Sequence, residues 1–131
     1  MADAAPFSET FQQRFHPRNA DGVTVLSVRG RLTAEQFEDL RLEVEAACRA
    51  GWRGVVCDVQ SIGDDADIDD QLMHLVQCYT ALARAGVVFN FLHAARFIGP
   101  WRNPVMTPRP PAFETEDEAV ADVRTRCAAS R

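Results

Sequence analysis

Apolar residues recur along the chain at two different periods, and these periods predict its strands and helices. Residues 10–16 alternate with period two, with Phe11 and Phe15 on one side, which predicts a strand. Asp21-Gly22 predicts a hairpin turn because both residues tolerate positive φ, and the β-rich run Val23–Arg29 follows it. The chain is therefore expected to open with an antiparallel hairpin.

The middle of the chain alternates helices with short apolar strands. Thr33 is expected to open the first helix, because Gln36 lies three residues later and completes a capping box. Gly51 is expected to end it. The runs Gly54–Val59 and Val87–Leu92 are typical of strands buried in a sheet. The first helix has one stripe of core-facing positions: Phe37, Leu40, Val44, Ala47 and Cys48.

A second helix is predicted between these two strands, after the loop 60–67 and up to residue 85. Its expected core stripe is Leu72, Leu75, Val76, Tyr79, Leu82 and Ala83. The stretch 99–111 holds five of the seven prolines, which excludes a regular helix. Apolar residues in this stretch are expected to pack back over the sheet: Trp101, Val105 and Met106. Phe113-Glu114 predicts a short last strand, and the capping box of Thr115 and Glu118 begins a final helix.

This order of elements predicts an α/β fold. Right-handed crossovers between the later strands make those strands parallel. We therefore expect a central mixed sheet of about five strands, a hairpin followed by parallel strands, with three to four helices. Residues 1–9 are expected to form a flexible leader and residues 10–131 a single domain.

Composition and charge narrow the classes of function. The net charge of −5 argues against a nucleic-acid partner, which would require a basic stripe for phosphate contacts. No apolar run has the length of a membrane span, and no signal peptide is recognisable. The cysteines form no C-x-x-C pair and fall among apolar residues, which favours reduced thiols and a cytoplasmic protein: Cys48, Cys57, Cys78 and Cys127.

The motifs, taken in this order, resemble those of the STAS domain, the sulfate-transporter and anti-sigma-factor-antagonist family. That family reads Val-x-Val-x-x-x-Gly-Arg-Leu before its first helix; Gly30, Arg31 and Leu32 stand on its Gly-Arg-Leu, and Val25 stands one residue before the place of its second valine. From the first to the last, the similar segments extend over about four fifths of the chain: Asp21–Arg41, Gly54–Val59, Leu82–Gly86, Val87–Leu92 and Phe113–Val123. The resemblance implies a STAS-like fold and a non-enzymatic protein-interaction domain in bacterial signalling, similar to an anti-sigma factor antagonist or a stressosome component.

The resemblance also locates the family's phosphorylation site, where a partner kinase modifies a serine or threonine before the second helix. Counting back from Gly86 places Gln71 on the family's glycine and Asp69 and Asp70 on its two hydroxyl residues. A shift of one residue places Asp70 alone on the hydroxyl position. In both alignments the phosphoacceptor is missing, and Ser61 lies several residues too early.

Five aspartates crowd this loop within seven residues: Asp64, Asp65, Asp67, Asp69 and Asp70. Three interpretations stay open. The carboxylates cap the helix and are otherwise solvated. Alternatively, they form a permanently charged recognition site for a partner that carries arginine or lysine. The third interpretation is a small-ligand or metal sensor with Asp65, Asp67 and Asp69 as weak metal ligands, although Asp70 and Val76 exclude an EF-hand.

The expected contact surface for a protein partner lies at the start of the second helix: Asp67, Asp69, Asp70, Gln71, Met73 and His74. The expected partner is an anti-sigma factor of the kinase-like type or a stressosome component. On a helical wheel, Asp70 and His74 lie opposite the core stripe and Cys78 lies at its edge, which predicts a surface Asp–His pair. A zinc site would need further ligands, which neither His16 nor His93 supplies at a suitable spacing. No catalytic triad or cofactor motif is found, and the oligomeric state, a homodimer included, stays open.

Overall fold

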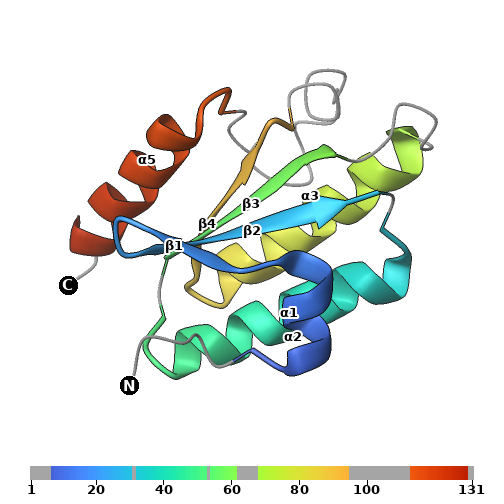
Figure 1. Ribbon diagram of the computed structural model, residues 1–131, viewed down its shortest axis with the longest axis horizontal. Coiled ribbons are helices and arrows are strands. Elements are labelled where there is room, and N and C mark those ends of the chain that lie inside the picture. Colours follow the sequence, from blue (N-terminus) through green and yellow to red (C-terminus); the bar gives the residue numbers. More distant parts are fainter. Residues whose placement is uncertain (1–6, 31, 53, 62–67, 95–112, 130–131) are drawn as a thin grey trace.

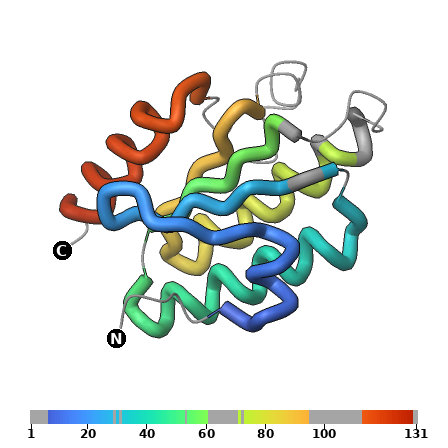
Figure 2. Tube along the Cα trace, viewed as in Figure 1, coloured from blue at the N-terminus to red at the C-terminus, as the bar shows by residue number. Residues whose placement is uncertain are grey.

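The computed structural model describes residues 7–30, 32–52, 54–61, 68–94 and 113–129 (Figures 1 and 2). Its sheet has the strand order β1-β2-β3-β4, with the bounds Arg18–Ala20, Val23–Arg29, Gly54–Ser61 and Val88–Leu92. β1 pairs antiparallel with β2, and β2, β3 and β4 are mutually parallel. The structure thus confirms the α/β class and the mixed sheet, with a parallel arrangement after the hairpin.

The opening hairpin turns at the expected residues but uses a different first strand. Asp21 and Gly22 have φ angles of 52° and 84°, as the turn requires. The strand that pairs with β2 in this hairpin is β1, rather than residues 10–16. At the other end of the chain, Phe113 forms a single parallel bridge with Leu92 instead of a full strand. Among the described residues the sheet therefore has four strands, one fewer than expected.

The strand predicted at residues 10–16 is wrong, because Glu9–Phe15 forms the helix α1. The Ser8 hydroxyl caps this helix by accepting a hydrogen bond from the backbone N–H of the third residue. Three buried phenylalanines follow one another at a spacing of four residues, one just before α1 and two on its buried face: Phe7, Phe11 and Phe15. Because Phe7 is buried, residues 7–9 of the expected leader belong to the fold, and residues 1–6 lie outside the described residues.

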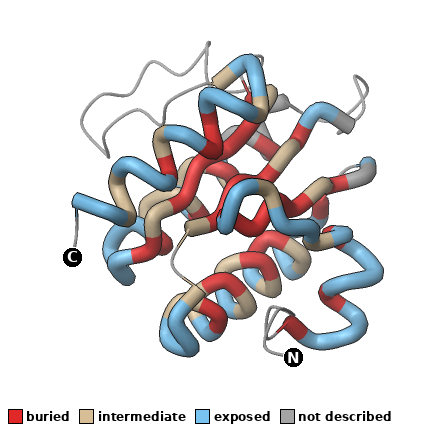
Figure 3. Tube along the Cα trace, turned by 60° about the vertical axis from the view of Figure 1, so that its left-hand side comes forward, coloured by how far each residue is buried: buried red, intermediate tan, exposed pale blue. Residues whose placement is uncertain are grey.

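Helices cover both faces of the sheet (Figure 1). On one face lie α1, α2 (Ala34–Arg49) and α3 (Ile68–Arg84), and on the other lies α5 (Glu116–Ala129). Strand residues alternate between the two cores, so that Val55 and Cys57 pack beneath α2 and α3 while Val56 packs beneath α5. Figure 3 shows the buried residues gathered in the strands and on the sides of the helices that face them. No described helix has the length and apolar character that a bilayer span requires.

Local capping signals set the ends of the helices as predicted. Thr33 and Gln36 form both bonds of the capping box at the start of α2. The N–H of Glu118 donates to the Thr115 hydroxyl at the start of α5. Beyond α2, Gly51 has a φ of 102°, and the next residue donates back to Ala47, as in a Schellman motif. Gly86 ends α3 in the same way.

The buried side of α3 is rotated from the stripe that the apolar pattern predicts. Among the side chains of α3 that are described, the fully or nearly buried ones are Gln71, Leu75, Cys78 and Leu82, whereas Ala83 is exposed. The rotation has a physical cause, since α3 packs against α2 as well as against the sheet, and the flank toward α2 is buried too. Cys78 therefore belongs to the core rather than to its edge.

Candidate partner-binding site

The start of α3 is fastened to the loop between β2 and α2 by one side chain. The Nε2 atom of Gln71 donates to the carbonyl oxygen of Leu32 at 2.8 Å. Its Oε1 atom accepts from the N–H of Leu32 at 3.3 Å. Both residues are buried, so two segments 39 residues apart in sequence form one surface. The expectation that Gln71 contacts a partner is corrected: its amide points inward and positions the site.

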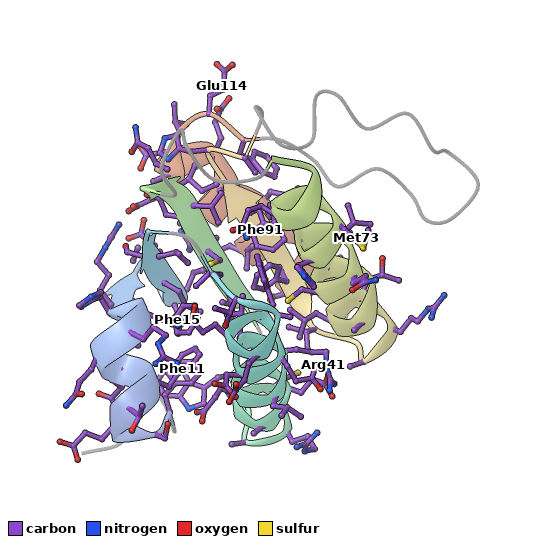
Figure 4. The ribbon with its side chains drawn as sticks, turned by 90° about the vertical axis from the view of Figure 1, so that its right-hand side faces the viewer. Phe11, Phe15, Arg41, Met73, Phe91 and Glu114 are labelled. Carbon is purple, nitrogen blue, oxygen red and sulfur yellow. The ribbon has the colours of Figure 1, made fainter. Side chains whose placement is uncertain are left out.

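Met73 presents the largest apolar side chain of this surface. It is 58% exposed and projects from the side of α3 that faces away from the sheet (Figure 4). Within the part of the chain that the structure describes, Leu42 is the other large hydrophobic residue that is exposed. A flexible thioether on a surface is a common feature of protein-binding sites. The geometry is thus consistent with the expected contact role of Met73.

The aspartates of the site fall partly inside the described structure. Asp69 and Asp70 are the second and third residues of α3, in the first helical turn, where the helix dipole favours negative charge. Nothing is described of their side chains, and the other three aspartates lie outside the described residues: Asp64, Asp65 and Asp67. The weak metal-site alternative at this loop is therefore not tested, and elsewhere among the described side chains no cluster of ligands suits a metal.

His74 lies one turn after Asp70, whose side chain is not among those described, so the expected Asp–His pair stays a prediction. The ring of His74 is half-buried and stacks on Phe37 of α2, with the ring centroids 5.4 Å apart and the planes at 23°. One turn further along α3, burial raises the pKa of the Cys78 thiol to about 12. A thiol that stays protonated at neutral pH is a poor nucleophile and a poor zinc ligand. His74 and Cys78 therefore belong to the packing of α3 against α2.

A polar cluster that the sequence pattern does not reveal lies at the carboxyl ends of the central strands. His93 follows β4 with a φ of 61°, and its Nδ1 atom lies 3.0 Å from Oδ1 of Asp58 on β3. Both side chains are half-buried. Arg18 of β1 binds Glu116 of α5 on the same face, which raises the pKa of the arginine and lowers that of the carboxylate. Asp58 pairs with Leu92, the residue before His93, through the register of β3 and β4, and the sequence pattern alone does not fix this register.

Comparison with known proteins gives structural relatives only. No protein-family model and no curated protein matches the sequence. The crystal structure of TM1081 from Thermotoga maritima, a candidate anti-sigma factor antagonist, superposes with a TM-score of 0.59 at 16% identity, over 84% of this chain and 94% of that one. The chain has the STAS fold predicted from its sequence.

Two further structures resemble the chain in fold at similarly low sequence identity. The NMR structure of TM1081 has a TM-score of 0.58 at 18% identity, over 84% of this chain and 88% of that chain. The murine anion transporter Slc26a9, in its inward-facing state, has a TM-score of 0.54 at 14% identity. The match covers 82% of this chain but 18% of the transporter. At such identities the likeness shows the STAS fold and leaves function to be argued from the site.

Proposed function

We propose that this chain is a non-enzymatic protein-interaction domain of bacterial signalling, an anti-sigma factor antagonist or a stressosome component that acts in the cytoplasm. Its partner surface is the start of α3 together with the segment at Leu32 and Thr33, which Gln71 fastens to α3 through Leu32. The observation that carries the proposal is the exposure of Met73, 58%, three residues after Asp70 and so one turn from the two aspartates that begin that helix. An apolar anchor bordered by charge is the usual composition of a binding site for a protein.

The aspartates give this surface a fixed charge. Asp69 and Asp70 occupy the places in which the resemblance expects phosphorylatable residues, and each carries about one negative charge against about two for a phosphate. The partner is therefore expected to present arginine or lysine to the first turn of α3. Recognition by this surface does not depend on a kinase, and its regulation is set by the partner.

Affinity capture from a native lysate of the source organism tests the proposal. Wild type is compared with the double variant Asp69→Ala/Asp70→Ala and with Met73→Ser. The controls are Asp117→Ala, an exposed acid on α5, and Leu42→Ser, the matching exposed hydrophobe on α2. We expect a protein that wild type and both controls retain and that both site variants lose. An identical set of captured proteins for all five forms would refute the location of the surface.

The role of charge is tested separately on the captured partner. Asp70→Asn keeps the size of the side chain and removes its charge. We expect weaker binding and a smaller loss of affinity as salt is raised from low to physiological concentration, since screening acts on the charge that the variant lacks. An unchanged affinity at every salt concentration would leave Asp70 as a helix-capping residue only.

A further inference from the structure

The helix α1 is held in place mainly by apolar contacts. It packs on β2 and α2, and Figure 4 shows Phe11 and Phe15 on the side of α1 that faces α2. Both phenylalanines are buried, and the N–H of Ser8 donates to Oε1 of Glu43 on α2 at 3.0 Å. We call the part of β2 and α2 that this helix covers the α1-binding surface.

α1 is too short to be stable away from this surface. It has seven residues, and isolated helices of fewer than about 12 residues are marginal in water. The rings of Phe11 and Phe15 stack with centroids 4.4 Å apart, and both rings would meet water if the helix left the α1-binding surface. A released α1 is therefore stabilised again only on its own surface or on an identical one.

The connection between α1 and β1 is short and strained. It consists of His16 and Pro17, because β1 begins at Arg18. His16 has a φ of 47° and a ψ of 61°, a left-handed conformation that costs free energy in any residue with a side chain. The proline that follows shifts the preceding residue toward extended conformations. The sequence of this hinge thus favours an extended connection, whereas the packing of α1 on its own chain requires a left-handed one.

We infer that α1 exchanges between two copies of this chain, with His16 and Pro17 as the hinge. Each α1 then occupies the α1-binding surface of the other copy, and the reciprocal exchange closes a dimer with two-fold symmetry. The contacts of α1 are the same in monomer and dimer. Relief of strain at two hinges favours the dimer, and the entropy lost when two chains associate opposes it. The exchange is independent of the proposed function, because α1 lies outside the partner surface at the start of α3.

Refolding at two protein concentrations tests the exchange. Wild type is unfolded in urea and refolded at about 10 μM and at about 1 mM, the effective concentration that a short connection gives to a tethered segment. A reductant is present throughout because the cysteines are free thiols. Size-exclusion chromatography with light scattering should find a monomer at the lower concentration and a substantial share of dimer at the higher one. A wild type that is monomeric at both concentrations would overturn the inference.

Substitutions at the hinge separate its strain from other causes of association. His16→Gly adopts the left-handed conformation at little cost, and at two hinges it should lower the association constant of the dimer at least about tenfold. His16→Val favours an extended hinge and should raise that constant. The control is Asp21→Gly, which relieves a residue with a φ of 52° outside the hinge and should associate as wild type does. Thermal unfolding first establishes that the variants are folded. The same association constant in both His16 variants would refute the hinge.

A dimer of mixed labelling identifies the exchanged segment. It is refolded at high concentration from equal amounts of isotope-labelled and unlabelled chains. Nuclear Overhauser effects between the two kinds of chain are expected from the phenylalanine rings of α1 in one copy to methyl groups of α2 in the other. A dimer in which the two chains meet through any other surface, such as that around Met73, would show that α1 stays on its own chain and would end the inference.

Discussion

Gln71 makes with Leu32 the two hydrogen bonds that a neighbouring strand would make. Its side-chain amide donates to the carbonyl oxygen of Leu32 at 2.8 Å and accepts from its N–H at 3.3 Å. Gln71 is fully buried and Leu32 is 2% exposed, so water has little access to replace either bond. A single side chain therefore sets the position of the first turn of α3 against the loop that precedes α2.

Replacement of Gln71 by alanine is expected to lower the free energy of unfolding by about 2–3 kcal/mol, because it leaves two buried backbone groups of Leu32 without partners. Urea unfolding measures the loss. Gln77→Ala removes the same side chain from an exposed position of the same helix and is expected to cost about 0.5 kcal/mol or less. Similar losses in the two variants would show that the bonds to Leu32 contribute little.

Local chemistry made much of the fold predictable. The capping box of Thr33 and Gln36 and the glycines that follow α2 and α3 act within a few residues of chain, and each is confirmed. The apolar runs of β3 and β4 are too short for helices, and their type and order are confirmed as well. The parallel arrangement followed from the connections between them.

The features that could not be predicted depend on contacts between residues far apart along the chain, or on a cap outside the repeating pattern. Phe11 and Phe15 lie four residues apart, a spacing that fits both a strand with period two and one turn of a helix. The N-cap at Ser8 favours the helix. Gln71 looked like a surface residue because its partner is 39 residues away. The pair of Asp58 and His93, 35 residues apart, was invisible for the same reason.

The buried Asn90 is expected to hold α5 on the sheet. It donates to Asp122 at 2.9 Å and to the carbonyl of Ala119 at 3.3 Å, and it accepts from Arg126 at 2.6 Å. Asn90→Ala is expected to cost about 2–3 kcal/mol, since these groups lose a buried partner. Hydrogen exchange locates the effect: amides of α5 should lose protection more than those of α2. Equal losses in both helices would contradict the assignment.

Gly54 is expected to tolerate no larger residue, because α5 crosses β3 closely at this point. A Cβ atom at Gly54 would lie 2.4 Å from Cγ1 of Val123 and 3.2 Å from the sulfur of Cys127. Gly54→Ala should lower the free energy of unfolding by about 1–3 kcal/mol through overpacking. Val123→Ala removes the clashing methyl groups, so the double variant should lose at least about 0.5 kcal/mol less than the sum of the single losses. Additive losses would show that the clash relaxes elsewhere.

The two buried thiols are expected to make the fold sensitive to alkaline pH. Burial raises the pKa of Cys57 well above its ordinary value of 9.0 and that of Cys78 to about 12. The unfolded chain releases these protons near pH 9 while the folded chain keeps them, so stability is full below pH 9 and falls as pH rises toward 12. Each thiol contributes a slope of up to about 1.4 kcal/mol per pH unit.

Urea unfolding between pH 8 and 11 measures this slope in wild type, in Cys78→Ala and in Leu75→Ala. Both variants lose packing in the core at every pH, because both positions are buried. Cys78→Ala is expected to show a shallower decline with pH, since one of the two titrating thiols is gone. Leu75→Ala should decline in parallel with wild type, because it removes no ionisable group. A decline in Cys78→Ala as steep as that of wild type would mean that the Cys78 thiol ionises without unfolding of the chain.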